Sequence, residues 1–90
     1  MDQNSKVNEL ISKNQLHEAL EFLNRMIEES PASDKLYFER GKLLWRLGDR
    51  GAAMGDYAKA KSINPDSPAV RALELAYDVA NFFNPDLYNP

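Results

Sequence analysis

The chain has 90 residues, a net charge of −3 and no cysteine, and 43% of its residues are hydrophobic and 28% charged. This length fits one small domain, the apolar content argues against disorder, and the acidic balance argues against a nucleic-acid partner, since neutralising phosphates needs many lysines and arginines. The lack of cysteine excludes disulfides and thiolate chemistry and fits the cytoplasm, and we expect neither a secretory signal nor a membrane-spanning helix, because no sufficiently long apolar run is present.

Two helical patterns occupy the first third of the chain. The first covers residues 2–13, and Asn14 after it tolerates the left-handed conformation that ends a helix. The second covers residues 16–29, and Pro31 stops it. Its apolar stripe consists of Ala19, Leu20, Leu23, Met26 and Ile27.

A second pair of helices follows with clear start and stop signals. Ser33 is a good N-cap for a helix over residues 34–47, and Gly48 can end that helix. Asp49 can cap the next helix, over residues 50–63, which Asn64 and Pro65 end. The inward stripe of that helix is Ala53, Tyr57 and Ala60.

The fifth helix is predicted over residues 68–83, with Ser67 as N-cap and Pro68 at the first helical position. Its polar strip is narrow, and apolar side chains cover about two thirds of its circumference. Residues 84–90 carry two prolines and are typical of a turn or extended segment. Because a terminal helix should have a broad polar outer face, we expect something to cover this one. The candidates are the chain's own Leu87 and Tyr88, or a partner such as a second copy.

Much of the chain repeats after 34 residues, the distance between Pro31 and Pro65. This shift also superimposes Leu10 on Leu44, Ile11 on Trp45, Asn14 on Gly48, Ala19 on Ala53, Leu23 on Tyr57, Met26 on Ala60, and Ser33 on Ser67. A fixed period of this length indicates stacked helix pairs, and the short connections make neighbouring helices antiparallel. The sequence therefore predicts an all-α array, whose functions are binding or assembly.

The second unit carries a recognisable pattern of small and turn-forming residues: Gly41, Gly48, Asp49, Ala53, Tyr57, Ala60 and Pro65. At these positions it resembles a tetratricopeptide repeat. The first unit is degenerate, with Val7 and Asn14 where the family has glycines. The resemblance implies a right-handed α-solenoid in one domain: a degenerate unit over residues 1–33, a unit over 34–67, a capping helix over 68–83 and a tail over 84–90. Small stand-alone bacterial members of the family have this organisation.

Family members mostly bind extended peptides or partner helices on the concave face formed by the first helix of each pair. Carried over by position, this resemblance places on that face Asn4, Asn8, Ile11, Lys35, Phe38, Lys42, Trp45, Arg46, Ala69, Ala72, Ala76 and Ala80. Some members bind the C-terminal carboxylate of a chaperone with a set of residues on this face. Of that set, only Asn8 is present in this chain.

The strip from Lys35 to Arg46 is the best functional candidate. Its cations flank Phe38 and Trp45, which suits an acidic or aromatic peptide through charge steering and cation–π contacts. The alternative is that both aromatic residues pack against neighbouring helices while the cations are merely solvated.

We expect no catalysis, metal or cofactor. His17 is the single histidine and has neither a nucleophile nor further ligands in a recognisable pattern, and no Gly-Lys-Ser/Thr follows the glycines. The predicted function is non-catalytic protein or peptide binding by a protein expected to be a monomer. The alternative is a self-assembling module that associates through the fifth helix and the tail.

Overall fold

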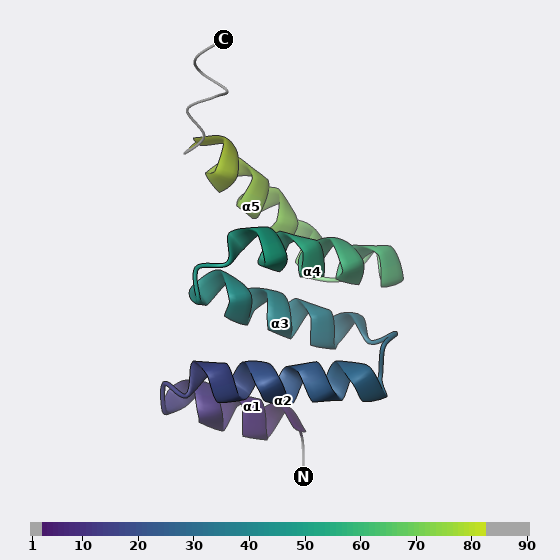
Figure 1. The fold of residues 1–90 in the computed structure, drawn as a ribbon. Helices are drawn as coiled ribbons and strands as arrows, with labels where there is room; N and C mark the ends of the chain where they lie inside the picture. The colour runs from purple at the N-terminus through teal and green to yellow at the C-terminus, as the bar shows by residue number, and fades with distance from the viewer. Residues whose placement is uncertain (1–2, 83–90) are drawn as a thin grey trace.

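The computed structural model describes residues 3–82, and the elements formed by these residues are five α-helices without a strand (Figure 1). The helices are α1 (Gln3–Ser12), α2 (Leu16–Glu29), α3 (Asp34–Arg46), α4 (Arg50–Ile63) and α5 (Ala69–Phe82). The predicted all-α class is therefore confirmed, and each predicted helix is present to within a residue at the ends that the structure describes. The predicted tail, residues 84–90, lies outside the described residues.

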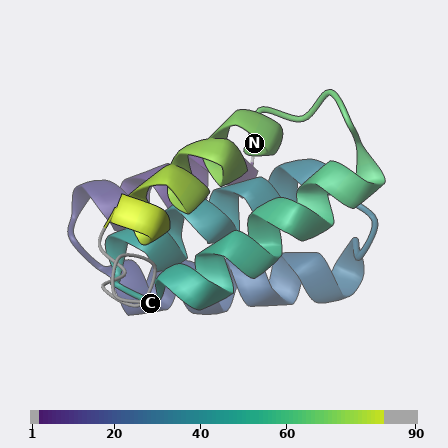
Figure 2. The same ribbon diagram turned by 90° about the horizontal axis from the view of Figure 1, so that it is seen from above.

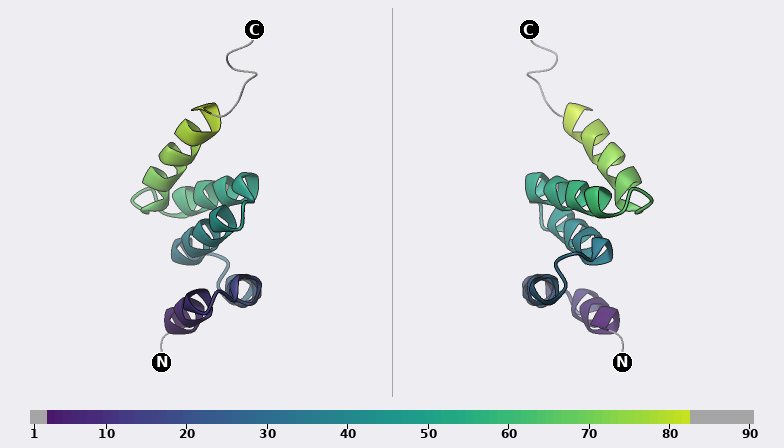
Figure 3. Two further views of the ribbon diagram at one scale, coloured as in Figure 1. Left: turned by 90° about the vertical axis from the view of Figure 1, so that its left-hand side faces the viewer. Right: turned by 90° about the vertical axis from the view of Figure 1, so that its right-hand side faces the viewer.

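The helices stack in chain order into an elongated molecule of 52 × 29 × 18 Å (Figure 1). Each helix packs mainly against its neighbours in the sequence, and α5 crosses α4 at a steeper angle than α3 does. Figures 2 and 3 show α1, α3 and α5 toward one side of the stack and α2 and α4 toward the other. The first helix of each pair therefore contributes to a common face.

One apolar core runs through the helices from α1 to α5. Its most deeply buried members include Val7, Leu23, Ala53, Ala60 and Ala69, one or more from four of the five helices. The predicted inward stripes of α2 and α4 are buried, apart from Leu20 in α2, which is half-buried. In α3, Leu36 and Leu43 are buried as the apolar face predicts.

The helix ends follow the sequence signals. The side chains of Ser33, Asp49 and Ser67 accept hydrogen bonds from backbone N–H groups two or three residues later, which satisfies donors that the first turn leaves free. Asn14 and Gly48 have φ values of 60° and 93°, in the left-handed region that ends a helix and reverses the chain.

Gly41 allows α3 and α4 to approach closely. A Cβ at this position would lie 2.6 Å from Cε1 of Tyr57 and 3.2 Å from the carbonyl oxygen of Ala53. Only a residue without a side chain fits, which explains why a glycine stands inside a helix despite its cost of about 1 kcal/mol relative to alanine.

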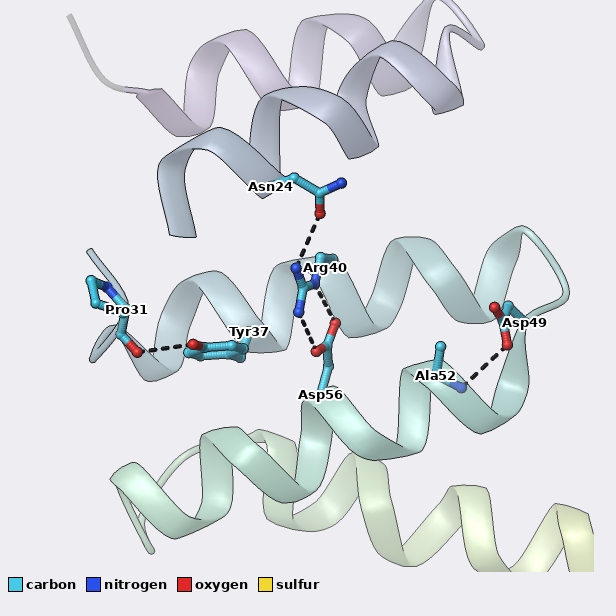
Figure 4. Close-up of polar contacts among 7 residues, drawn as sticks. All are labelled: Asn24, Pro31, Tyr37, Arg40, Asp49, Ala52 and Asp56. Atoms are coloured by element: carbon cyan, nitrogen blue, oxygen red, sulfur yellow. Dashed lines mark hydrogen bonds and ion pairs between the residues drawn. The ribbon is translucent and has the colours of Figure 1, made fainter. Parts of the chain in front are cut away.

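A polar bridge crosses the stack where α2, α3 and α4 meet (Figure 4). The Arg40 guanidinium donates from Nε and Nη2 to the two carboxylate oxygens of Asp56, at 2.7 and 2.8 Å, and from Nη1 to Oδ1 of Asn24 at 3.0 Å. The pairing is bidentate, the strongest arrangement for these groups. The hydrogen bond from Arg40 to Asp56 raises the guanidinium pKa, and partial burial opposes this rise. The bridge joins the first helix pair to the second.

Candidate functional site

An apolar groove of about 260 Å³ opens where α5 crosses α3 and α4. It is lined by Trp45, Tyr57, Ala72, Leu75, Ala76 and Val79. We call it the α3–α5 groove. The small alanine side chains of α5 leave the space that the groove occupies, and the larger rings of Trp45 and Tyr57 form the opposite wall. Its lining suits an apolar side chain.

A second, more polar hollow of about 200 Å³ lies between α1 and α3. It is lined by Asn8, Ile11, Glu39, Lys42, Leu43 and Arg46. We call it the α1–α3 pocket. Lys42 and Arg46 are both exposed, and Lys42 is ion-paired with Glu39 of the same pocket, so the surplus positive charge of the pocket comes from Arg46.

Both hollows share α3 as a wall. At 100° per residue, Trp45, Lys42, Arg46 and Glu39 follow one another around one arc of this helix, with Trp45 on the α5 side and Glu39 on the α1 side. Consequently a ligand that crosses α3 between the hollows meets Lys42 at the midpoint.

Cations stack on the aromatic rings along this arc. Nζ of Lys42 lies 4.7 Å from the centroid of the Phe38 ring and 3.1 Å from Oε1 of Glu39. The Arg50 guanidinium lies 5.0 Å from the Trp45 ring, so a positive charge stands beside one wall of the α3–α5 groove. Phe38 itself is half-buried and lies 6.0 Å from the Tyr57 ring, centroid to centroid. Phe38 and Trp45 therefore pack against the core and remain partly exposed on the side formed by α1, α3 and α5.

The residues expected on the concave face divide into three groups. Asn8, Ile11, Lys42 and Arg46 meet in the α1–α3 pocket, whereas Trp45, Ala72 and Ala76 meet in the α3–α5 groove. The third group lines neither hollow. In this group Lys35 is exposed and Phe38 packs on Tyr57. Ala69 is fully buried in the core, and Ala80 is half-buried. Asn4 belongs to α1, but its side chain lies outside the description.

Several contributors were not among the residues expected on the concave face. Leu75 and Val79 line the α3–α5 groove, and Arg50 lies over the ring of Trp45, which forms one of its walls. The signal for the α5 residues was present, because both lie on the broad apolar arc of that helix. Arg50 follows the turn after α3, and no periodicity links it to Trp45.

Burial raises the pKa of the Tyr57 phenol above its ordinary value of 10, and the nearby carboxylates of Asp56 and Glu39 raise it further. His17 is exposed. Among residues 3–82, no cluster of three or more histidine, aspartate or glutamate side chains is arranged to hold a metal ion. The described helices include none with the length and apolar character needed to cross a membrane.

Comparison with known proteins identifies the relatives of this chain. The tetratricopeptide repeat model matches residues 34–67, the unit that carries the sequence pattern. A Bacteroides fragilis protein, BF1650, whose structure was solved by NMR in solution, is similar over 99% of this chain and 91% of its own, with 37% identity and a TM-score of 0.85. No curated protein matches. Tetratricopeptide repeats generally act as non-enzymatic scaffolds for protein interactions, and the chain belongs to this family.

Proposed function

We propose that the protein is a non-catalytic scaffold that binds an extended, acidic segment of a partner protein across α1, α3 and α5. The observation that carries this proposal is the pairing of an apolar groove with a cationic pocket on either side of α3. An apolar anchor residue of the partner enters the α3–α5 groove. Its flanking carboxylates meet Lys42, Arg46 and Arg50.

The charges around the hollows favour an acidic ligand over a basic one. Lys42 and Arg46 line the α1–α3 pocket, and Arg50 lies over the Trp45 ring. Glu39 is paired with Lys42 and offsets its charge, so Arg46 and Arg50 supply the surplus positive charge. Charge complementarity of this kind mainly raises the association rate and excludes partners of the wrong sign. We therefore expect binding to weaken as salt is added.

The two hollows are small, so the affinity should be modest. Stable interfaces usually bury about 1,200–2,000 Å² in total, and we expect a ligand confined to these two hollows to bury less. We expect weak, reversible binding by a monomer. The cytoplasmic location suggested by the lack of cysteine, and the bacterial origin suggested by the Bacteroides relative, are consistent with this role.

Trp45 provides the direct test, because it is the single tryptophan of the chain and lines the groove. We would titrate peptides in which aspartates flank one leucine, with the matched peptides that carry lysines instead, and follow Trp45 fluorescence. The aspartate peptides should shift the emission and bind more tightly than the lysine peptides. Lys42→Glu should weaken this binding, whereas the control Lys59→Glu, at an exposed position of α4, should not. Equal responses to both peptide sets, or none, would remove the proposal.

Self-assembly through α5 is the second candidate. Leu75 and Tyr77 are 48% and 52% exposed, the highest values among the large hydrophobic residues that the structure describes. Sedimentation at increasing concentration tests this candidate: association that Tyr77→Ser abolishes would support it, and a monomer throughout would exclude it.

A further inference from the structure

We propose that the α3–α5 groove is a slot for an aromatic ring, so that the anchor of the partner segment is a phenylalanine, tyrosine or tryptophan rather than an aliphatic residue. The anchor belongs to the acidic segment of the proposed function, on which this inference rests. The inference adds the chemical class of the group that enters the groove.

The groove is large enough for an aromatic side chain. Its volume is about 260 Å³, whereas an apolar cavity of about 150 Å³ already holds a benzene ring. Phenylalanine, tyrosine and tryptophan bury about 150–250 Å² each when they are enclosed. A smaller aliphatic side chain leaves more of the groove unfilled, which forfeits contacts with the lining.

The two walls of the groove suit a flat group. On the α5 wall, Ala72 and Ala76 lie one helical turn apart and present only methyl groups. The opposite wall carries the rings of Trp45 and Tyr57. A ligand ring between these walls lies against methyl groups on one side and against aromatic rings on the other. Contacts between aromatic rings contribute more than their buried area alone, equivalent to about two- to tenfold in affinity.

The rings of the groove already belong to a series of aromatic contacts. The Tyr57 ring lies 6.0 Å from the Phe38 ring, centroid to centroid, with the two planes tilted by 47°. Aromatic pairs in proteins prefer separations of about 4.5–7 Å. A ligand ring in the groove therefore extends an existing aromatic cluster rather than forming an isolated contact.

The charges beside the groove suit carboxylates on either side of the anchor. Arg46 follows Trp45 directly in α3 and lines the α1–α3 pocket, whereas Arg50 of α4 lies over the Trp45 ring. Among the side chains that the structure describes, neither arginine forms an ion pair. An aromatic residue flanked by aspartates or glutamates is therefore complementary to the groove in shape and to the two arginines in charge.

Matched peptides separate an aromatic anchor from one that is merely large. The full chain is titrated with peptides in which aspartates flank phenylalanine, leucine or cyclohexylalanine, whose puckered ring lacks π electrons, while the fluorescence of Trp45 is followed. We expect the phenylalanine peptide to bind about two- to tenfold more tightly than the leucine peptide, and more tightly than the cyclohexylalanine peptide. If either aliphatic peptide binds as tightly as the phenylalanine peptide, the proposed function stands and this inference is overturned.

Methyl NMR signals locate the bound ring. The ring current of the phenylalanine peptide should shift the methyl signals of Ala72 and Ala76, and the leucine peptide should shift them less. The methyl signal of Ala58, exposed in α4, should stay unchanged with both peptides. A ring-current shift at Ala58 instead of at the two groove alanines would contradict the inference.

Trp45→Leu keeps the groove wall apolar but removes its ring. The preference for phenylalanine over leucine should then disappear, with methyl signals replacing fluorescence as the readout and circular dichroism verifying the fold. The control is Phe22→Leu, which removes a half-buried ring of α2 that also carries an arginine, Arg25, and it should keep the preference. Ala72→Leu fills the groove from the other wall and should weaken the phenylalanine peptide most. A preference that survives both groove variants would overturn the inference.

Phenol and cyclohexanol test the groove without a partner segment. If phenol saturates the shifts of Ala72 and Ala76 at a lower concentration than cyclohexanol, the groove prefers aromatic rings. That result together with no peptide binding would support the slot and remove the proposed function. Equal effects of the two alcohols, or none, would overturn the inference.

Discussion

Gly41 is the residue at which the packing of the second unit is most tightly constrained. Gly41→Ala places a methyl group 2.6 Å from the Tyr57 ring and near the backbone of Ala53, neither of which can easily move. Overpacking of this kind costs about 1–3 kcal/mol. We therefore expect a lower melting temperature, by about 4–8 °C for each kcal/mol in a domain of this size. Thermal unfolding followed by circular dichroism measures the change.

Gly55→Ala is the matched control, since this glycine also lies within a helix but a Cβ there meets nothing within 4 Å. Alanine should stabilise that position by about 0.5–1 kcal/mol through its better helix propensity. Equal effects at both glycines would contradict the packing account.

Tyr57 gives a prediction about pH. Its phenol has a pKa above 10 in the folded chain, because burial disfavours the phenolate, whereas the unfolded phenol ionises near 10. The stability that comes from keeping Tyr57 neutral is therefore complete below pH 10 and is lost as the pH rises through the folded value. A phenolate absorbance titration should show a late-ionising tyrosine that Tyr57→Phe removes. If the variant keeps that late step, the assignment is wrong.

The sequence predicted single residues well where one local signal decides the conformation. Ser33, Asp49 and Ser67 cap helices, and Asn14 and Gly48 adopt positive φ, because each role depends on the residue and its immediate neighbours. Partners that lie on different helices were harder to predict. Arg40 and Asp56 stand within the apolar stripes of α3 and α4, and a charge in such a stripe was an available signal that was not used.

At the scale of the helices, the bridge from Arg40 determines how α2, α3 and α4 lie together. The Asp56 side chain is only 9% exposed and that of Arg40 is 24% exposed. Arg40→Met leaves the carboxylate buried without its partner, which costs about 3–5 kcal/mol in a buried pair. We expect Asp56→Leu to cost less, because the free guanidinium can reach water. Urea unfolding of the two variants measures this difference.

The double variant, Arg40→Met with Asp56→Leu, should recover part of the loss, since it removes both charges together. Lys13→Met is the control for an exposed ion pair. Nζ of Lys13 lies 3.0 Å from Oε1 of Glu9, and both side chains are largely exposed. This change should lower the free energy of unfolding by less than about 1 kcal/mol. Strictly additive losses in the double variant would mean that the two residues do not act as a pair.

At the scale of the whole molecule, three signals together predicted the fold. The start and stop signals predicted the helices and their order, the short connections predicted antiparallel neighbours, and the 34-residue period indicated that the helix pairs stack. The site was predicted only in part. Period and resemblance placed Trp45, Lys42 and Ala76 on the side formed by α1, α3 and α5, where they line the two hollows. The shape of the α3–α5 groove depends on the angle at which α5 crosses α4, and no periodicity contains that angle.

The central claim is that ligands bind on the side formed by α1, α3 and α5, and amide chemical-shift mapping during a titration with an aspartate-flanked leucine peptide tests it most directly. We predict that the perturbed signals cluster at Asn8, Lys42, Trp45 and Ala76. Exposed positions on the opposite helices, such as Glu21 in α2 and Ala58 in α4, should stay unchanged. Perturbations centred on α2 and α4 would contradict the account.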